Sequence, residues 1–190
     1  MFHQFVFIIV LLWWPCQSFS QPPKYRANQA KVILTAQVET LAVQGLSHNG
    51  TSVLNIETGQ LLFVVPVQSF QFQSRIVQKY FNYPGFTYSK KFPHFKFKGQ
   101  VVNFANLETK KNIPQSIVIK GRLTVRGVTH PIEATGILTR VNHQKLQATA
   151  QLIVPDVFSF GIGKQEDTRF LRGTQLKITI EATYYKQARE

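Results

Sequence analysis

Residues 116–138, SIVIKGRLTVRGVTHPIEATGIL, predict a β-hairpin around which the rest of the chain is organised. Side chains of a strand alternate between its two faces, so a strand with one buried face repeats apolar residues with a period of two. The inward face of the first arm would hold Ile117, Ile119, Gly121, Leu123 and Val125. After a turn at residues 126–129, the inward face of the second arm would hold Ile132, Ala134, Gly136 and Leu138.

Strand-like alternation recurs before and after this hairpin. Further candidate strands are residues 31–43, 51–56, 60–67, 92–104, 145–154 and 175–185. Asn49-Gly50 is a turn signal. Residues 74–82 carry apolar side chains at helical spacing, which predicts one short helix. About eight strands without a long linker predict an all-β antiparallel barrel or sandwich, and closure into a barrel removes exposed strand edges.

The first 20 residues differ sharply from the rest of the chain. Residues 5–14, FVFIIVLLWW, form an apolar run that is too short to span a bilayer comfortably and suits the core of an export signal. Ser18 and Ser20 place small residues before a cut after Ser20. We therefore expect a cleavable signal peptide at residues 1–20, a flexible leader at 21–30 and one β domain at 31–190, with an uncleaved anchor as the alternative.

Charge and cysteine content restrict the chemistry of the exported chain. Cys16 is the only cysteine and lies in the predicted signal, so the remaining chain would have no disulfide, thiol nucleophile or thiolate metal ligand. The chain has 22 Lys and Arg against nine Asp and Glu, a net charge of +13. This charge favours contact with an anionic partner, and a basic solvated surface is the other interpretation.

Small residues occupy the middle of three successive inward faces of the predicted barrel. They are Gly121, Ala134, Gly136, Ala148 and Ala150. A filled core favours bulky side chains at such positions, and a barrel of eight strands is about the size that can be either filled or hold one slim ligand. The pattern by itself leaves three interpretations open: a cavity, a core filled by aromatic side chains such as Phe95, Phe97 and Phe104, or small residues that the twist of the strands requires.

The turn of the hairpin also carries a family resemblance. Residues 120–131, KGRLTVRGVTHP, resemble the Gly-x-Leu-Thr-x-x-Gly-Val-Thr-x-Pro signature of the YceI-like family. VQKYFN at 77–82 is similar to the short helix of that family, KFP and FKFKG at 91–99 to its Lys-Tyr-Pro…Phe-Lys segment, and FSFGI at 158–162 to its Asp-Phe/Tyr-Gly-Ile stretch. The resemblance covers residues 31–185. Arg126 and Ser159 depart from it, because many members have His and Asp there.

The resemblance implies an extended antiparallel eight-stranded, lipocalin-like barrel with one short helix, exported to the periplasm or outside the cell. It also implies binding of a long isoprenoid chain, of the polyprenol or quinone class, along the barrel axis for sequestration or transport. The short helix or nearby loops would gate access. With the inward phase of the strands, the predicted channel lining is Phe95, Phe97, Ile119, Gly121, Leu123, Ala134, Gly136, Ala148, Ala150, Phe160 and Ile162.

The sequence predicts no catalytic, metal or cofactor site. His48, His94, His130 and His143 form no HxH or HExxH pair, and no Gly-x-Ser-x-Gly, P-loop or dinucleotide motif is present. We therefore expect a binding protein without a cofactor. The alternatives are an enzyme that acts on a lipid and a stress-related exported barrel with a filled core and no ligand.

Basic and aromatic residues alternate in residues 95–98, FKFK. Alternation places the two lysines and the two phenylalanines on opposite faces, whereas a platform that stacks nucleic-acid bases needs both on one face. We therefore expect no nucleic-acid partner, and the oligomeric state stays open.

We expect transient contact with an anionic membrane surface through outward-pointing basic residues. These residues are Lys96, Lys98, Lys120, Arg122 and Arg126.

Overall fold

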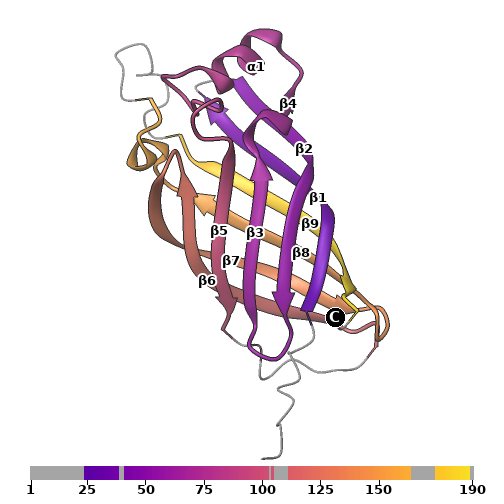
Figure 1. The fold of residues 1–190 in the computed structure, drawn as a ribbon. Helices are drawn as coiled ribbons and strands as arrows, with labels where there is room; N and C mark the ends of the chain where they lie inside the picture. Colours follow the sequence, from indigo (N-terminus) through magenta and orange to yellow (C-terminus); the bar gives the residue numbers. More distant parts are fainter. Residues whose placement is uncertain (1–23, 39–40, 103, 105–110, 164–173, 189–190) are drawn as a thin grey trace, which may run out of the picture.

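The chain folds into a closed antiparallel barrel (Figure 1), in a computed structural model that describes residues 24–38, 41–102, 104, 111–163 and 174–188. Within these residues the strand order is β1-β9-β8-β7-β6-β5-β3-β2, a β1–β2 pairing closes the ring, and β4 adds to β2. The strands are β1 (Lys24–Val38), β2 (Leu41–Asn55), β3 (Gln60–Pro66), β4 (Gln71–Phe72), β5 (His94–Val101), β6 (Pro114–Val125), β7 (Val128–Arg140), β8 (Lys145–Val154) and β9 (Leu176–Lys186). The predicted eight-stranded antiparallel barrel is confirmed.

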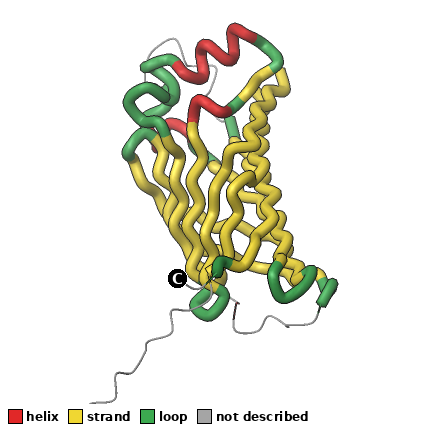
Figure 2. The backbone as a smooth tube through the Cα atoms, turned by 45° about the vertical axis from the view of Figure 1, so that its right-hand side comes forward, coloured by secondary structure: helices red, strands yellow, loops and turns green. Residues whose placement is uncertain are grey.

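Helix α1 (Arg75–Asn82) lies at one end of the barrel together with the 3-10 turns η1 (Val67–Ser69) and η3 (Val157–Phe160), and the C terminus lies at the other end (Figures 1 and 2). Ser74 caps the helix, because the backbone N–H of Val77 donates to its hydroxyl at 3.4 Å. The short helix predicted from the spacing of apolar residues is therefore confirmed. We call its end of the barrel the α1 end and the opposite end the C-terminal end.

The central hairpin is formed by β6 and β7, which are paired from Pro114↔Thr139 to Val125↔Val128. The connecting residues Arg126 and Gly127 both have positive φ, 52° and 79°. Positive φ at both central residues is the signature of a type I′ turn, whose twist matches that of the two strands. The predicted inward face is largely buried and Lys120 and Arg122 are exposed, so the phase read from the sequence is confirmed.

The predicted flexible leader is wrong where the structure describes it, because β1 begins at Lys24. Tyr25, Ala27 and Ala30 are buried, and the hydroxyl of Tyr25 donates to the His143 carbonyl at 2.8 Å. The strand was missed because the pairing with β2 shifts register between Ala27 and Ala30, and this bulge breaks the period of two. The predicted signal and its cut after Ser20 lie outside the described residues.

The turn predicted at Asn49-Gly50 is also wrong, because both residues lie inside β2. Instead, β1 and β2 pair up to Val38 and Leu41. Gly50 pairs with Ala30 next to the bulge of β1. A Cβ atom at this position would lie 2.8 Å from Cζ of Phe63 and 2.9 Å from the Ala30 carbonyl oxygen. The glycine therefore serves close packing inside the barrel rather than a turn.

Candidate functional site

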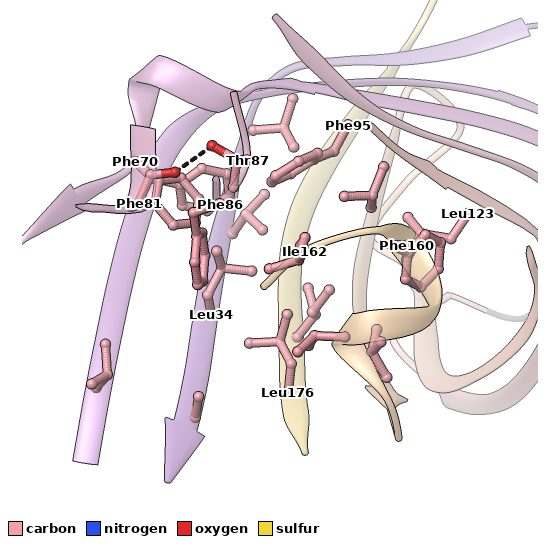
Figure 3. A pocket seen from close by; sticks show the side chains of 18 of the residues that line it. Leu34, Phe70, Phe81, Phe86, Thr87, Phe95, Leu123, Phe160, Ile162 and Leu176 are labelled. Carbon is pink, nitrogen blue, oxygen red and sulfur yellow. Dashed lines mark hydrogen bonds between the residues drawn. The ribbon is translucent and has the colours of Figure 1, made fainter. Parts of the chain in front are cut away.

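The barrel contains a cavity of about 340 Å³ at the α1 end (Figure 3). Side chains from β1, β2, β3, β5, β6, β8 and β9 form its walls, and α1 and η3 contribute side chains at the end. Its lining is hydrophobic except for Tyr80, Thr87, Lys96 and Thr174. The hydroxyl of Thr87 is already bonded to the carbonyl oxygen of Phe81. The cavity is therefore suited to an apolar molecule with few hydrogen-bonding groups.

Helix α1 covers part of this cavity with its apolar face. Ile76, Val77, Tyr80 and Phe81 all line the cavity, as the helical spacing predicts. Phe81 is buried, whereas Ile76 is 79% exposed. Because Ile76 both lines the cavity and faces solvent, the cavity reaches the surface beside the first turn of α1.

Aromatic side chains join α1 to the barrel. The ring of Phe81 lies 4.8 Å from that of Phe72, 5.7 Å from that of Phe70, 5.9 Å from that of Phe86 and 6.3 Å from that of Phe95, measured between centroids. Tilted and edge-to-face pairs at such distances add stability beyond the burial of their area. Figure 3 shows Phe70, Phe81 and Phe86 grouped on one side of the cavity.

Gln78 attaches α1 to the segment around β4 through both ends of its side-chain amide. Its Nε2 donates to the carbonyl of Phe70 and its Oε1 accepts from the backbone N–H of Phe72, each at 3.0 Å. These bonds satisfy backbone groups of Phe72 in β4 and of Phe70 just before it. Gln78 therefore holds the helix in place across the cavity.

Arg126 ties together two loops at the rim of the cavity. Its Nη1 donates to the carbonyl oxygens of Phe86 at 2.6 Å, Gly161 at 2.8 Å and Gly85 at 3.4 Å. Phe86 lines the cavity, and Gly161 lies between the lining residues Phe160 and Ile162. A positive φ at a residue other than glycine costs about 1–3 kcal/mol, and the three carbonyl contacts offset this cost. The expectation that Arg126 points into solvent is wrong.

A second, smaller cavity of about 50 Å³ lies nearer the C-terminal end of the barrel. Four alanines line it, Ala134, Ala148, Ala150 and Ala182. At its edge the hydroxyl of Tyr184 donates to Ser52 at 2.8 Å, and Ser52 donates to the Leu62 carbonyl at 2.9 Å. Burial raises the pKa of Tyr184 to about 12, and the side-chain hydrogen bond with Ser52 acts in the opposite direction.

The structure divides the predicted lining residues between the two cavities. Those in the main cavity are Phe95, Phe97, Leu123, Phe160 and Ile162. Those in the smaller cavity are Ile119, Ala134, Ala148, Ala150 and, again, Phe97. Gly121 and Gly136 line neither cavity. These lining side chains thus point inward, and the structure distributes them over two cavities.

The two predicted lining glycines serve close contact instead of open space. A Cβ atom at Gly121 would lie 2.5 Å from Cζ of Phe97, and one at Gly136 would lie 2.2 Å from the carbonyl oxygen of Thr149. The ring of Phe97 covers Gly121, and the backbone of β8 covers Gly136. The prediction that these two glycines open a path for a ligand is therefore wrong, and the alternative of aromatic filling holds at Gly121.

Several residues that shape the site were not predicted. Phe63 and Phe70 line the main cavity, Gln78 holds α1 and Arg126 holds the rim. Phe63 lies in an apolar run that indicates a buried strand without showing which face is inward. Nothing in the local sequence indicates the carbonyl partners of Arg126, because they lie about 35 to 41 residues away along the chain.

The exposed basic residues of β5 and β6 form one patch on the outer wall. Lys96, Lys98, Lys120 and Arg122 are exposed, and Lys98 and Arg122 are direct cross-strand partners. Lys120 also lies 3.5 Å from Glu133 in an exposed ion pair. We call these four residues the β5–β6 basic patch. The aromatic residues of β5 point to the interior, as the alternation predicts.

The described part of the chain contains neither a cluster of metal-ligating side chains nor a long apolar helix. No group of three or more His, Cys, Asp or Glu residues could hold a metal ion there. No described helix is long and apolar enough to cross a membrane.

His130 contacts the Ser159 carbonyl at 3.0 Å and packs its ring edge-on against Phe160 at 4.8 Å, so it takes part in the packing of η3.

Fold and cavities together define a β-barrel that encloses an apolar binding space. The YceI-like domain model matches residues 25–184, and the chain belongs to this family. No curated protein matches it significantly.

Solved structures show the same fold at low sequence identity. The chain is similar to a polyisoprenoid binding domain from Saccharophagus degradans implicated in plant cell wall breakdown, with a TM-score of 0.70, 10% identity and coverage of 86% of this chain and 98% of that one. It is similar to BcnA of Burkholderia cenocepacia, with a TM-score of 0.65, 12% identity and coverage of 81% and 95%. It is also similar to the YCEI protein of Campylobacter jejuni, with a TM-score of 0.56, 16% identity and coverage of 80% of this chain and 89% of that one.

Proposed function

We propose that this protein binds an apolar lipid chain of the isoprenoid type, such as a polyprenol or a quinone tail, in the main cavity of its barrel. The observation that carries the proposal is the cavity itself: about 340 Å³ enclosed almost entirely by aliphatic and aromatic side chains. The structural similarity to a polyisoprenoid binding domain supports the choice of ligand class.

The driving force would be the removal of the ligand from water. Burial of hydrocarbon contributes about 0.8 kcal/mol per CH₂ group, so a chain of several isoprene units needs no polar contact to bind. The polar head group would stay at the α1 end, where Ile76 both lines the cavity and is exposed. The barrel would act by sequestration or transport, after export to the periplasm or outside the cell.

The test is mass spectrometry of the protein purified without detergent, followed by uptake of farnesol by the delipidated protein. A released apolar chain and saturable uptake support the proposal, and repeated absence of both contradicts it. Ile178→Trp would fill the main cavity, because Ile178 lines it from β9. Ile153→Trp is the matched control, because Ile153 lies on β8, is 54% exposed and lines neither cavity.

We propose binding without catalysis. Among the described residues that line the main cavity, the polar side chains are two threonines, one tyrosine and one lysine, and no carboxylate or histidine is present. Histidine and carboxylates are the most common general acid–base groups, and the lysine, Lys96, is exposed on the strand face opposite Phe95 and Phe97. Recovery of a chemically altered lipid after incubation with the delipidated protein would favour the enzyme alternative instead.

A further inference from the structure

Phe63 of β3 and Phe97 of β5 are direct cross-strand partners in the middle of the barrel. Both side chains point inward and are almost completely buried, at 6% and 7% exposure. Both line the main cavity and both line the smaller cavity. The two rings therefore lie between the cavities.

Two further side chains complete this partition from the opposite wall. Leu152 of β8 and Ile180 of β9 are the other residues that line both cavities. In the closed strand order, β8 and β9 are separated from β3 and β5 by two strands on either side. Side chains from opposite walls thus lie at the boundary between the two cavities, and we call these four residues the partition.

Glycines hold the two rings in place. A Cβ atom at Gly99 would lie 2.7 Å from Cε1 of Phe97, one at Gly121 2.5 Å from Cζ of Phe97, and one at Gly50 2.8 Å from Cζ of Phe63. Gly99 and Gly121 are themselves cross-strand partners. The ring of Phe97 therefore lies against bare backbone of two strands, a packing arrangement that stabilises glycines in sheets.

We propose that the partition sets the length of the apolar chain that the barrel accepts. This inference rests on the proposed function. A chain that enters at the α1 end fills the main cavity and stops at Phe63 and Phe97, although apolar space continues beyond them. A ring that swung toward the C-terminal end would itself fill the smaller cavity of about 50 Å³. Movement of one ring therefore does not open a longer path.

The test measures affinity against chain length with geraniol, farnesol, geranylgeraniol and solanesol. Each isoprenol displaces the apolar fluorophore N-phenyl-1-naphthylamine from delipidated protein. We expect the affinity of the wild type to rise with each added isoprene unit up to one chain length and to stay level beyond it. Phe97→Ala joins the two cavities, so its affinity should keep rising, by roughly tenfold or more, for the next longer isoprenol.

Phe95→Ala is the matched control. Phe95 lies two residues from Phe97 on the same face of β5 and lines the main cavity alone. It should weaken the binding of every isoprenol without moving the chain length at which affinity levels off. Phe63→Ala should move that length as Phe97→Ala does, and Phe97→Leu is used if neither alanine variant folds.

The outcomes separate this inference from the proposed function. If affinity in the wild type rises through solanesol, or levels off at the same chain length in the folded partition variants, the partition does not limit the chain. If no isoprenol displaces the fluorophore from the wild type, the proposed function fails and the inference fails with it. A crystal structure with farnesol should show the chain ending on the α1 side of Phe97, and density beyond Phe97 would overturn the inference.

Discussion

The ring of Phe97 occupies the space that a side chain at Gly121 would need, since a Cβ atom there would lie 2.5 Å from Cζ of Phe97. The two residues lie on the same face of neighbouring strands, β5 and β6, two residues out of register. Glycine at 121 thus lets an aromatic ring lie against the barrel wall. This contact helps to place the ring of Phe97 between the main cavity and the smaller cavity, where Phe63, Leu152 and Ile180 also lie.

Loss of the Arg126 side chain should loosen the rim of the main cavity. Arg126→Ala leaves the carbonyl oxygens of Phe86 and Gly161 without this donor, and we expect a loss of roughly 1–3 kcal/mol in the free energy of unfolding. Urea unfolding measures the loss in the free energy of unfolding. Hydrogen exchange at the amide of Gly163, which donates to the carbonyl of Gly85, measures the opening of the two rim loops directly. Arg122→Ala, on the exposed face of β6, should change stability by less than about 0.5 kcal/mol. Equal effects of the two substitutions would contradict the role of Arg126.

The buried phenol of Tyr184 should make stability fall at high pH. Its pKa is raised from 10.0 to about 12 in the folded protein. Folding favours the neutral phenol, so the contribution of Tyr184 to the free energy of unfolding is fully present below pH 10. This contribution is lost as the pH rises toward 12, and the total loss is roughly 3 kcal/mol. Urea unfolding at pH 9 and pH 11 measures the change.

Replacement of single tyrosines isolates this effect. Tyr184→Phe should reduce the fall in stability between pH 9 and pH 11, because no buried phenol is left there to ionise. Tyr185→Phe is the control, since Tyr185 is 53% exposed on the same strand. A pH dependence that survives in Tyr184→Phe and disappears in Tyr185→Phe would show that the assignment is wrong.

Gly136→Ala should destabilise the barrel without changing the shape of either cavity. The added Cβ atom would lie 2.2 Å from the Thr149 carbonyl oxygen, and backbone must move to relieve this contact. We expect a loss of about 2 kcal/mol or more, against less than about 0.5 kcal/mol for Thr135→Ala on the exposed face. Thermal unfolding measures both. A variant as stable as the wild type but altered in lipid uptake would restore the interpretation of Gly136 as part of a ligand path.

The β5–β6 basic patch is proposed to contact anionic membranes. Lys96→Glu, Lys98→Glu and Arg122→Glu together should weaken binding to phosphatidylglycerol-containing vesicles roughly tenfold or more at low salt, because each basic residue near such a surface contributes about 1 kcal/mol. Co-sedimentation measures the bound fraction. The control reverses Lys24, Lys177 and Lys186, which are exposed on β1 and β9. If both triple variants lose binding equally, net charge alone is responsible and the patch has no special role.

Much of the architecture was predictable because strand geometry is local. Residues 116–138 alternate apolar and polar side chains, and the structure has β6 and β7 in that register with the expected faces. The same holds for α1, where spacing and the Ser74 cap are both visible in a nine-residue stretch. The strand at Lys24–Val38 was seen only in part because its bulge interrupts the alternation that a single pattern can detect.

The sequence by itself determined which side chains point inward, because a strand's backbone sends successive side chains to opposite faces. Only the tertiary structure decided where the interior is filled and where it is hollow. Phe63, Phe97, Leu152 and Ile180 come from four different strands on two walls, and only the closed barrel places all four between the two cavities. The empty volume between side chains depends on their shapes and on the distance across the barrel, neither of which a local pattern of residues contains.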